Sequence, residues 1–188
     1  MKKRFLSILA TLCLCLTLLP ATALAGSSTP VDVKTWAELQ AAINDNKDAK
    51  LTSDIKWGGS SLTVQEGKNV TINLNAHSID AEKNGTVIKV YGTLTLKNSG
   101  KDGLGGGSGS GAADGCLKNG TSGDKSGAGG IYIAPGGKLI MNGGWIYNCT
   151  STHSSDGAGG VYVSEGATFE MSAGVIRQCN GHPSEGLL

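Results

Sequence analysis

Two segments near the end of the chain repeat each other at a shift of 30 residues. The motif GAGGIYI begins at Gly127 and returns as GAGGVYV at Gly157. The same shift relates residues 138–149 to residues 168–179. A fixed period of this size is typical of a solenoid. Each unit is expected to hold three short strands, whose apolar faces become buried only when neighbouring units stack.

The repeat extends upstream in a more divergent form. Residues 115–119 align with residues 144–148 at a shift of 29 residues. Earlier segments with the period-two alternation of strands are residues 62–64, 70–74, 87–90 and 94–96. Stacking like on like predicts two ladders, an inward aliphatic one of Leu117, Ile146 and Ile176 and a ladder of turn amides of Asn119, Asn148 and Gln178.

A helix start signal stands ahead of the strands. Thr35 and Glu38 have the spacing of a capping box, in which each side chain accepts a hydrogen bond from the backbone N–H of the other residue. We expect a helix near 35–46 with one apolar face. Such a helix would cover the first unit of the solenoid, whose core and strand edges would otherwise meet water.

The first 25 residues have the pattern of a signal peptide. Lys2, Lys3 and Arg4 precede the apolar run 5–19, and small residues end at Ala25. We therefore predict a signal peptide over 1–25, a mature chain over 26–188 and export to the medium or the cell surface. The alternatives are an uncleaved anchor, for which the apolar run is short, and a lipoprotein, which the leucines before Cys13 and Cys15 disfavour.

The charge balance limits the classes of partner. Without the three basic residues of the signal peptide, 13 of the 16 basic residues remain against 15 acidic residues. This slightly acidic chain is not expected to bind nucleic acid, and it offers no basic patch for anionic lipid. We expect no membrane span after removal of the signal peptide, and one domain with a substantial core.

Two parts of the mature chain depart from the strand pattern. Residues 100–115 are mostly glycine, serine and alanine, which predicts a flexible loop. After Gly181 the chain has no closing helix or strand pattern, so the last unit would present an uncapped sheet edge. Either the chain is truncated at this end, which we favour, or another molecule covers the edge, for example by self-association.

Three cysteines remain in the mature chain. Cys149 and Cys179 occupy the same repeat position, so they are expected on neighbouring units, close to the α-carbon separation of about 5.5 to 6 Å that a disulfide prefers. The two alternatives are a disulfide between them and a stacked pair of half-buried thiols. Cys116 is left over in either case.

The repeat also places two tyrosines on one outward face. Tyr132 and Tyr162 share a repeat position, and Lys89 is predicted beside them. Exposed aromatic rings can stack on the apolar faces of sugar rings, so these three residues are the candidate ligand-binding site. The alternative is that the tyrosines only pack against each other as a cross-strand pair.

The sequence offers little for catalysis or metal binding. A polysaccharide lyase would need clustered carboxylates with a basic residue, and a glycosidase would need paired acids. Lys138, Glu165 and Glu170 are scattered, and we interpret them as solvated charges. No catalytic residue, metal site or cofactor is predicted. The remaining alternative is calcium bound by aspartates in glycine-rich segments, which are Asp102, Asp114, Asp124 and Asp156.

Three segments carry a resemblance to a known family. They are TWAELQAAI (35–43), LTSDI (51–55) and NVTINLNAHSI (69–79). With the Gly-Gly-x-Tyr repeats that follow, the chain resembles the N-terminal part of exported surface proteins of Gram-positive bacteria, adhesin-like relatives of the pectate-lyase-like superfamily. Ala76 departs from this resemblance, because relatives often have glycine there. The resemblance implies a right-handed parallel β-helix.

These observations predict an all-β protein, a right-handed parallel β-helix with a short N-terminal capping α-helix. The expected function is a secreted or cell-surface module for adhesion, with glycans or cell-surface proteins as partners and no catalysis. Two alternatives stay open. The chain is a polysaccharide lyase or glycoside hydrolase, or the N-terminal part of one, or it is a passive structural stalk.

Overall fold

The structure, a computed structural model, describes residues 29–99, 115–153 and 156–181. The predicted signal peptide, residues 100–114 of the glycine-rich segment and the tail beyond Gly181 lie outside the described residues. Within the described residues no helix is long and apolar enough to cross a membrane.

The helix near the start of the described chain is α2 (Trp36–Asn44). Its predicted capping box is present, because Glu38 N donates to Thr35 Oγ1 at 3.2 Å and Thr35 N donates to Glu38 Oε2 at 3.2 Å. The helix is shorter than the predicted range 35–46. Its buried face consists of Trp36, Leu39, Ala42 and Ile43.

A short strand precedes this helix, which the sequence analysis did not predict. β1 (Val31–Val33) pairs in parallel with β2 (Ala49–Leu51), so α2 is the crossover between two neighbouring strands. Val33 is fully buried, whereas Val31 is 40% exposed. The strand is only three residues long. Apolar and polar residues that alternate over so short a segment do not distinguish a strand from a loop.

All strand pairs among the described residues are parallel. The protein is therefore mostly β with parallel sheets, as predicted at this level. The strands after β2 are β3 (Ile55–Lys56), β4 (Leu62–Val64), β5 (Asn69–Asn73), β6 (Ser78–Asp80), β7 (Ile88–Val90), β8 (Thr93–Lys97), β9 (Cys116–Lys118), β10 (Thr121–Ser122), β11 (Ile131–Ile133), β12 (Lys138–Tyr147), β13 (Thr150–Ser151), β14 (Val161–Val163) and β15 (Thr168–Arg177).

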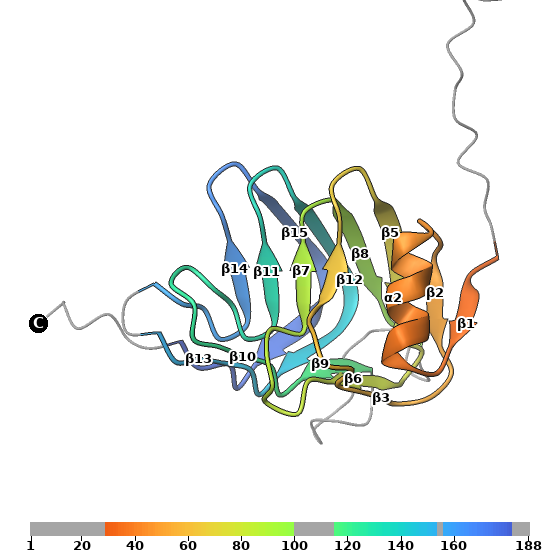
Figure 1. The fold of residues 1–188 in the computed structure, drawn as a ribbon, viewed down its shortest axis with the longest axis horizontal. Helices are drawn as coiled ribbons and strands as arrows, with labels where there is room; N and C mark the ends of the chain where they lie inside the picture. The colour runs from red at the N-terminus through yellow and green to blue at the C-terminus, as the bar shows by residue number, and fades with distance from the viewer. Residues whose placement is uncertain (1–28, 100–114, 154–155, 182–188) are drawn as a thin grey trace, which may run out of the picture.

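The strands form three sheets. A nine-stranded sheet has the order β1-β2-β5-β8-β12-β9-β6-β3, with β15 also paired to β12. A four-stranded sheet has the order β14-β11-β7-β4, and β10 pairs with β13. In Figure 1, β14, β11 and β7 lie side by side on the viewed face, β3, β6 and β9 run along the bottom, and α2 lies beside β2 and β1 at one end.

The large sheet bends within β12. Lys138–Met141 pair with β8, whereas Trp145–Tyr147 pair with β9. The register shifts between Met141 and Trp145, where Gly143 and Gly144 have φ angles of 149° and 83°. These two glycines let one ten-residue strand turn a corner, so the second and third predicted strands of the unit are continuous. β15 is also a ten-residue strand, and it pairs with β12 on both sides of this register shift.

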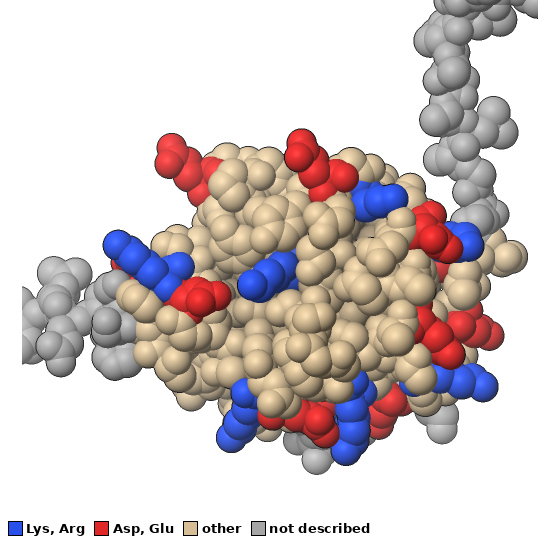
Figure 2. Space-filling model, viewed as in Figure 1, with Lys and Arg blue, Asp and Glu red and all other residues tan. Residues whose placement is uncertain are grey.

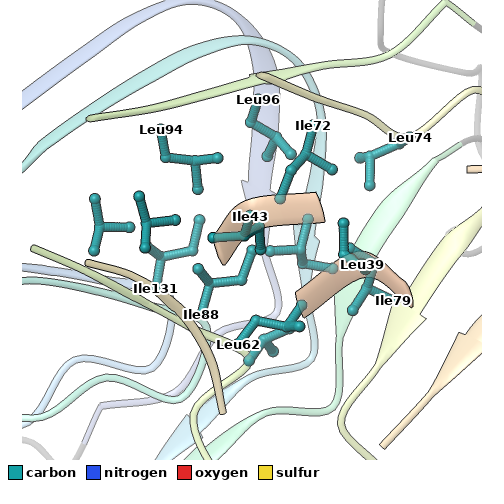
Figure 3. Packing of buried hydrophobic residues seen from close by; sticks show 14 of the residues in the cluster. Leu39, Ile43, Leu62, Ile72, Leu74, Ile79, Ile88, Leu94, Leu96 and Ile131 are labelled. Carbon is teal, nitrogen blue, oxygen red and sulfur yellow. The ribbon is translucent and has the colours of Figure 1, made fainter. Parts of the chain in front are cut away.

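The core lies between the sheets and is mainly aliphatic. Figure 3 shows Leu39 and Ile43 of α2 among leucines and isoleucines from both larger sheets. The predicted aliphatic ladder is confirmed, because Leu117 pairs with Ile146 and Ile146 pairs with Ile176. Leu117 and Ile146 are fully buried, but Ile176 is 38% exposed because β15 has only β12 as a partner strand among the described residues.

The Gly-Gly pair of the repeat has a packing role. A β-carbon at Gly130 would meet the backbone oxygen of Gly160 and would lie 2.7 Å from Ile146 Cγ2. At Gly160 the same atom would lie 2.7 Å from Ile176 Cγ2. Glycine at both positions therefore lets the backbone before β11 and β14 approach the aliphatic ladder directly.

Candidate functional site

The four-stranded sheet presents one row of outward side chains across its strands. In β4, β7 and β11 the first and third residues are buried and the middle residue is partly exposed, as period-two alternation requires. The register pairs Lys89 with Tyr132 and Tyr132 with Tyr162. We call Lys89, Tyr132 and Tyr162 the outer row. The prediction that these three side chains lie together is confirmed.

The aromatic rings of the outer row are ordered against each other. The rings of Tyr132 and Tyr162 are stacked, with centroids 5.9 Å apart and an interplanar angle of 17°. Tyr91, just after β7, packs edge-on against Tyr132 at 6.5 Å and 64°. Both arrangements are favourable for aromatic pairs. Tyr91 is 40% exposed, so three rings form a partly exposed aromatic surface on this sheet.

Two open depressions adjoin this surface. The first, of about 250 Å³, is lined by Lys89, Tyr91 and Tyr132 on one side and by the turn 124–127 on the other. The second, of about 320 Å³, extends to Trp57. The two depressions share Thr86, Lys89 and Asp124. They are therefore neighbours on this face, and we call the two depressions together the groove.

Local structure holds the wall of this groove. Gly127 N donates to the backbone oxygen of Asp124 at 3.1 Å, and Asp124 N donates to Ser122 Oγ at 3.2 Å. Thr86 Oγ1 donates to the backbone oxygen of Ala128 at 2.7 Å, which connects the floor to the segment before β11. In the second depression, a β-carbon at Gly85 would lie 2.7 Å from Trp57 Cη2, so glycine leaves room for the indole.

The groove is lined by charged side chains as well as aromatic rings, with Lys89, Asp124 and Lys125 among them. Lys125 Nζ lies 3.9 Å from Asp156 Oδ2 at one rim. Among the described residues no carboxylate oxygen lies within 4.0 Å of Lys89 Nζ. Figure 2 shows charged side chains of both signs along the lower rim, over β3, β6 and β9, and a basic side chain in the middle of an otherwise largely uncharged face. The groove therefore combines aromatic rings with several polar and charged groups.

Sequence reasoning found part of this site. It named the outer row, but it missed Tyr91, Trp57 and the groove contribution of Asp124. Tyr91 stands two residues after Lys89, so the period-two rule could have placed it on the same side. Trp57 and Asp124 lie in loops, and their place in the groove depends on tertiary packing that carries no periodic signal.

The charges considered for catalysis form an ordinary ion pair. Lys138 Nζ donates to Glu170 Oε1 at 2.7 Å, and the two side chains are 36% and 54% exposed. Glu165 is exposed in the turn before β15 and is not part of this pair. An ion pair this exposed is a surface contact of the kind expected for solvated charges.

Within residues 29–99, 115–153 and 156–181, no three His, Cys, Asp or Glu side chains gather in a way that could hold a metal ion. Of the aspartates considered for calcium, Asp124 lines the groove and Asp156 pairs with Lys125. Asp102 and Asp114 lie outside the described residues.

Cys149 and Cys179 are free thiols in the structure. A hydrogen bond between their side chains raises the pKa of Cys149, and burial adds to this effect. The same hydrogen bond, with Cys149 as donor, lowers the pKa of Cys179 to about 7. Cys149 is buried and Cys179 is partly exposed, and the disulfide stays a prediction.

Comparison of the chain with family models, with curated proteins and with solved structures gave no match. Function is therefore inferred from the chain's own residues.

Proposed function

We propose that the chain is a right-handed parallel β-helix that serves as an exported, non-catalytic binding module for saccharides. The strand pairing supports the fold. The chain returns to the four-stranded sheet in the order β4, β7, β11, β14, and every return is parallel to the strand before. Parallel strands joined in one sheet cross over with a right hand in about 98% of cases, which supports the handedness.

The observation that carries the proposed function is the groove lined by Tyr91 and Tyr132, with Tyr162 stacked beside Tyr132. Tyr132 and Tyr162 are stacked at 5.9 Å and are both partly exposed, and Tyr91 packs edge-on against Tyr132 and lines the groove. Sugar rings have apolar C–H faces that fit such a surface, and Lys89 with Asp124 can hydrogen-bond to hydroxyl groups. A linear saccharide long enough to span both depressions would also reach Trp57.

The absence of catalysis is part of this proposal. It is supported by the solvent exposure of the Lys138–Glu170 pair. Location outside the cell is supported by the signal-peptide pattern of residues 1–25 and by the resemblance to exported surface proteins.

A binding assay tests the proposal. The purified protein is titrated with soluble probes: a β-glucan hexasaccharide, a chitin hexasaccharide and polygalacturonate. We expect saturable binding of at least one probe and at least an about tenfold loss of affinity in Tyr132→Ala/Tyr162→Ala, since removing two stacking rings costs roughly 1.4 kcal/mol or more.

Tyr147→Ala is the matched control, because Tyr147 lies on β12, which belongs to the other large sheet, and is also partly exposed. Its affinity should equal that of the wild type. Cleavage of a probe would support the enzyme alternative instead. Failure of all probes to bind would support the passive stalk.

A further inference from the structure

Cys149 and Cys179 face each other across two consecutive turns of the chain. The flanking pairs are Tyr147 with Arg177 and Thr150 with Asn180, and Asn180 N donates to the backbone oxygen of Cys149 at 2.9 Å. The two cysteines are therefore in register on neighbouring parallel segments. Such α-carbons lie about 4.8 Å apart, within the range of about 4.4–6.8 Å that a disulfide spans.

The two thiols differ in access. Cys149 is fully buried, whereas Cys179 is partly exposed on the last described turn. Cys179 Sγ also lies 3.4 Å from the backbone oxygen of Arg177 and 3.5 Å from that of Ile146. A reagent from solvent can therefore reach Cys179 first, and Cys149 is the sulfur that stands directly behind it.

The third thiol has a different position. Cys116 is in register with Trp145, not with Cys149. On the preceding turn, the residue in register with Cys149 is Gly120. The backbone oxygen of Gly120 accepts a hydrogen bond from Thr150 N at 2.8 Å. Cys116 is therefore a natural control for any reaction that requires the facing pair.

We propose that Cys179 and Cys149 form a two-thiol redox site, in which Cys179 is the attacking thiol, Cys149 is the resolving thiol and a small-molecule disulfide is the oxidant. This inference is independent of saccharide binding. In the first step the Cys179 thiolate attacks one sulfur of the oxidant, a Cys179–oxidant disulfide forms, and the other half leaves as a thiolate.

In the second step Cys149 attacks the Cys179 sulfur as it gives up its proton to the departing half of the oxidant. The Cys149–Cys179 bond forms, and the second half of the oxidant leaves as a thiolate that takes up this proton. Overall the two cysteines lose two electrons and two protons, and one oxidant disulfide is reduced to two thiols. The lowered pKa of Cys179 favours it as the attacking group.

The test uses the reduced full chain and oxidised glutathione, with free thiols then blocked by N-ethylmaleimide. Trypsin cuts after Lys118, Lys138 and Arg177, so the three cysteines of the mature chain fall on separate peptides. We expect a linked pair of peptides that joins Cys149 to Cys179, with loss of two hydrogens from the protein mass. Cys116 should remain blocked by the maleimide.

Variants separate the two steps. Cys149→Ala should stop the reaction at a glutathione adduct on Cys179. Cys179→Ala should slow the reaction of the remaining thiols by at least about tenfold, because Cys149 is buried. Cys116→Ala should react like the wild type. A stable glutathione adduct on the wild type without the linked peptides, a link that includes Cys116, or no reaction at all would overturn the proposal.

Discussion

The side-chain nitrogen of Asn148 donates a hydrogen bond of 2.7 Å to the side-chain oxygen of Asn119, 29 residues earlier in the chain. Asn119 in turn donates to Asp80 Oδ1 at 2.9 Å. Both asparagines have left-handed backbone, with φ angles of 50° and 56°, a conformation that asparagine tolerates better than most residues. The predicted ladder of turn amides thus exists for Asn119 and Asn148, and Asp80 extends it by one turn. Gln178 shares the backbone conformation, with φ of 53°.

Asn119→Ala should lower the free energy of unfolding by about 2–3 kcal/mol. The substitution removes two hydrogen bonds and places an alanine in left-handed backbone. Asn119→Gly is the matched control, because glycine loses the same hydrogen bonds without the backbone strain, and it should cost about half as much. Denaturant unfolding of the two variants measures both effects. Equal losses would contradict the assignment of strain to this turn.

Ala76→Gly should stabilise the protein by about 0.5–1 kcal/mol. Ala76 has a φ angle of 64°, a conformation that glycine adopts without penalty. The matched control is Ala41→Gly on the exposed face of α2, which should destabilise by about 1 kcal/mol. The two changes are the same in chemistry, so opposite signs in thermal unfolding would confirm the conformational cause. A loss of stability in both would refute it.

Gly130→Ala should destabilise the protein by about 2 kcal/mol or more. The added methyl group would collide with the backbone of Gly160 and with Ile146 at the packed corner between two turns. At Gly123 the nearest atom to a new β-carbon is Thr152 Oγ1 at 3.5 Å, so Gly123→Ala should change stability by less than about 0.5 kcal/mol. Chemical denaturation of both variants checks this difference. A neutral Gly130→Ala would mean that the repeated glycine pair has another role.

The rate of alkylation of Cys179 by iodoacetamide should depend on pH with a half-point near pH 7. The thiolate is the reactive form, and the hydrogen bond from Cys149 lowers the pKa of Cys179 to about 7. Below that pH the thiol is protonated and the rate should fall tenfold per pH unit. The Cys179 sulfur also lies 3.4 Å from the backbone oxygen of Arg177, and the variant tested below leaves Arg177 unchanged.

Cys149→Ala removes the donor, so it should shift this half-point upward, toward the ordinary value of a cysteine. Peptide mapping after brief labelling at a series of pH values measures the rate at Cys179 separately from Cys116. A half-point that does not move in Cys149→Ala would show that the hydrogen bond is not the cause.

The sequence predicted the parts of the protein that repeat. The shift of 30 residues placed Tyr132 beside Tyr162, and the shift of 29 placed Leu117 beside Ile146, as the register confirms. A residue in a stacked unit has its neighbours determined by the period, so alignment of the chain with itself is enough.

The sequence did not predict the features that depend on single contacts. β1 is three residues long, and the continuous β12 depends on how Gly143 and Gly144 bend without breaking the pairing. The groove was missed because the turn 124–127 and Trp57 reach it from loops, whose positions follow from packing rather than from period.

Fluorine NMR of the protein with 3-fluorotyrosine is the most direct test of the proposed saccharide site. The chain has four tyrosines, of which Tyr91, Tyr132 and Tyr162 form the aromatic surface and Tyr147 lies on the other large sheet. During titration with a hexasaccharide that binds, the three resonances of the surface should shift together while that of Tyr147 stays in place. Binding that leaves those three unchanged, or that shifts Tyr147 alone, would contradict the proposed site.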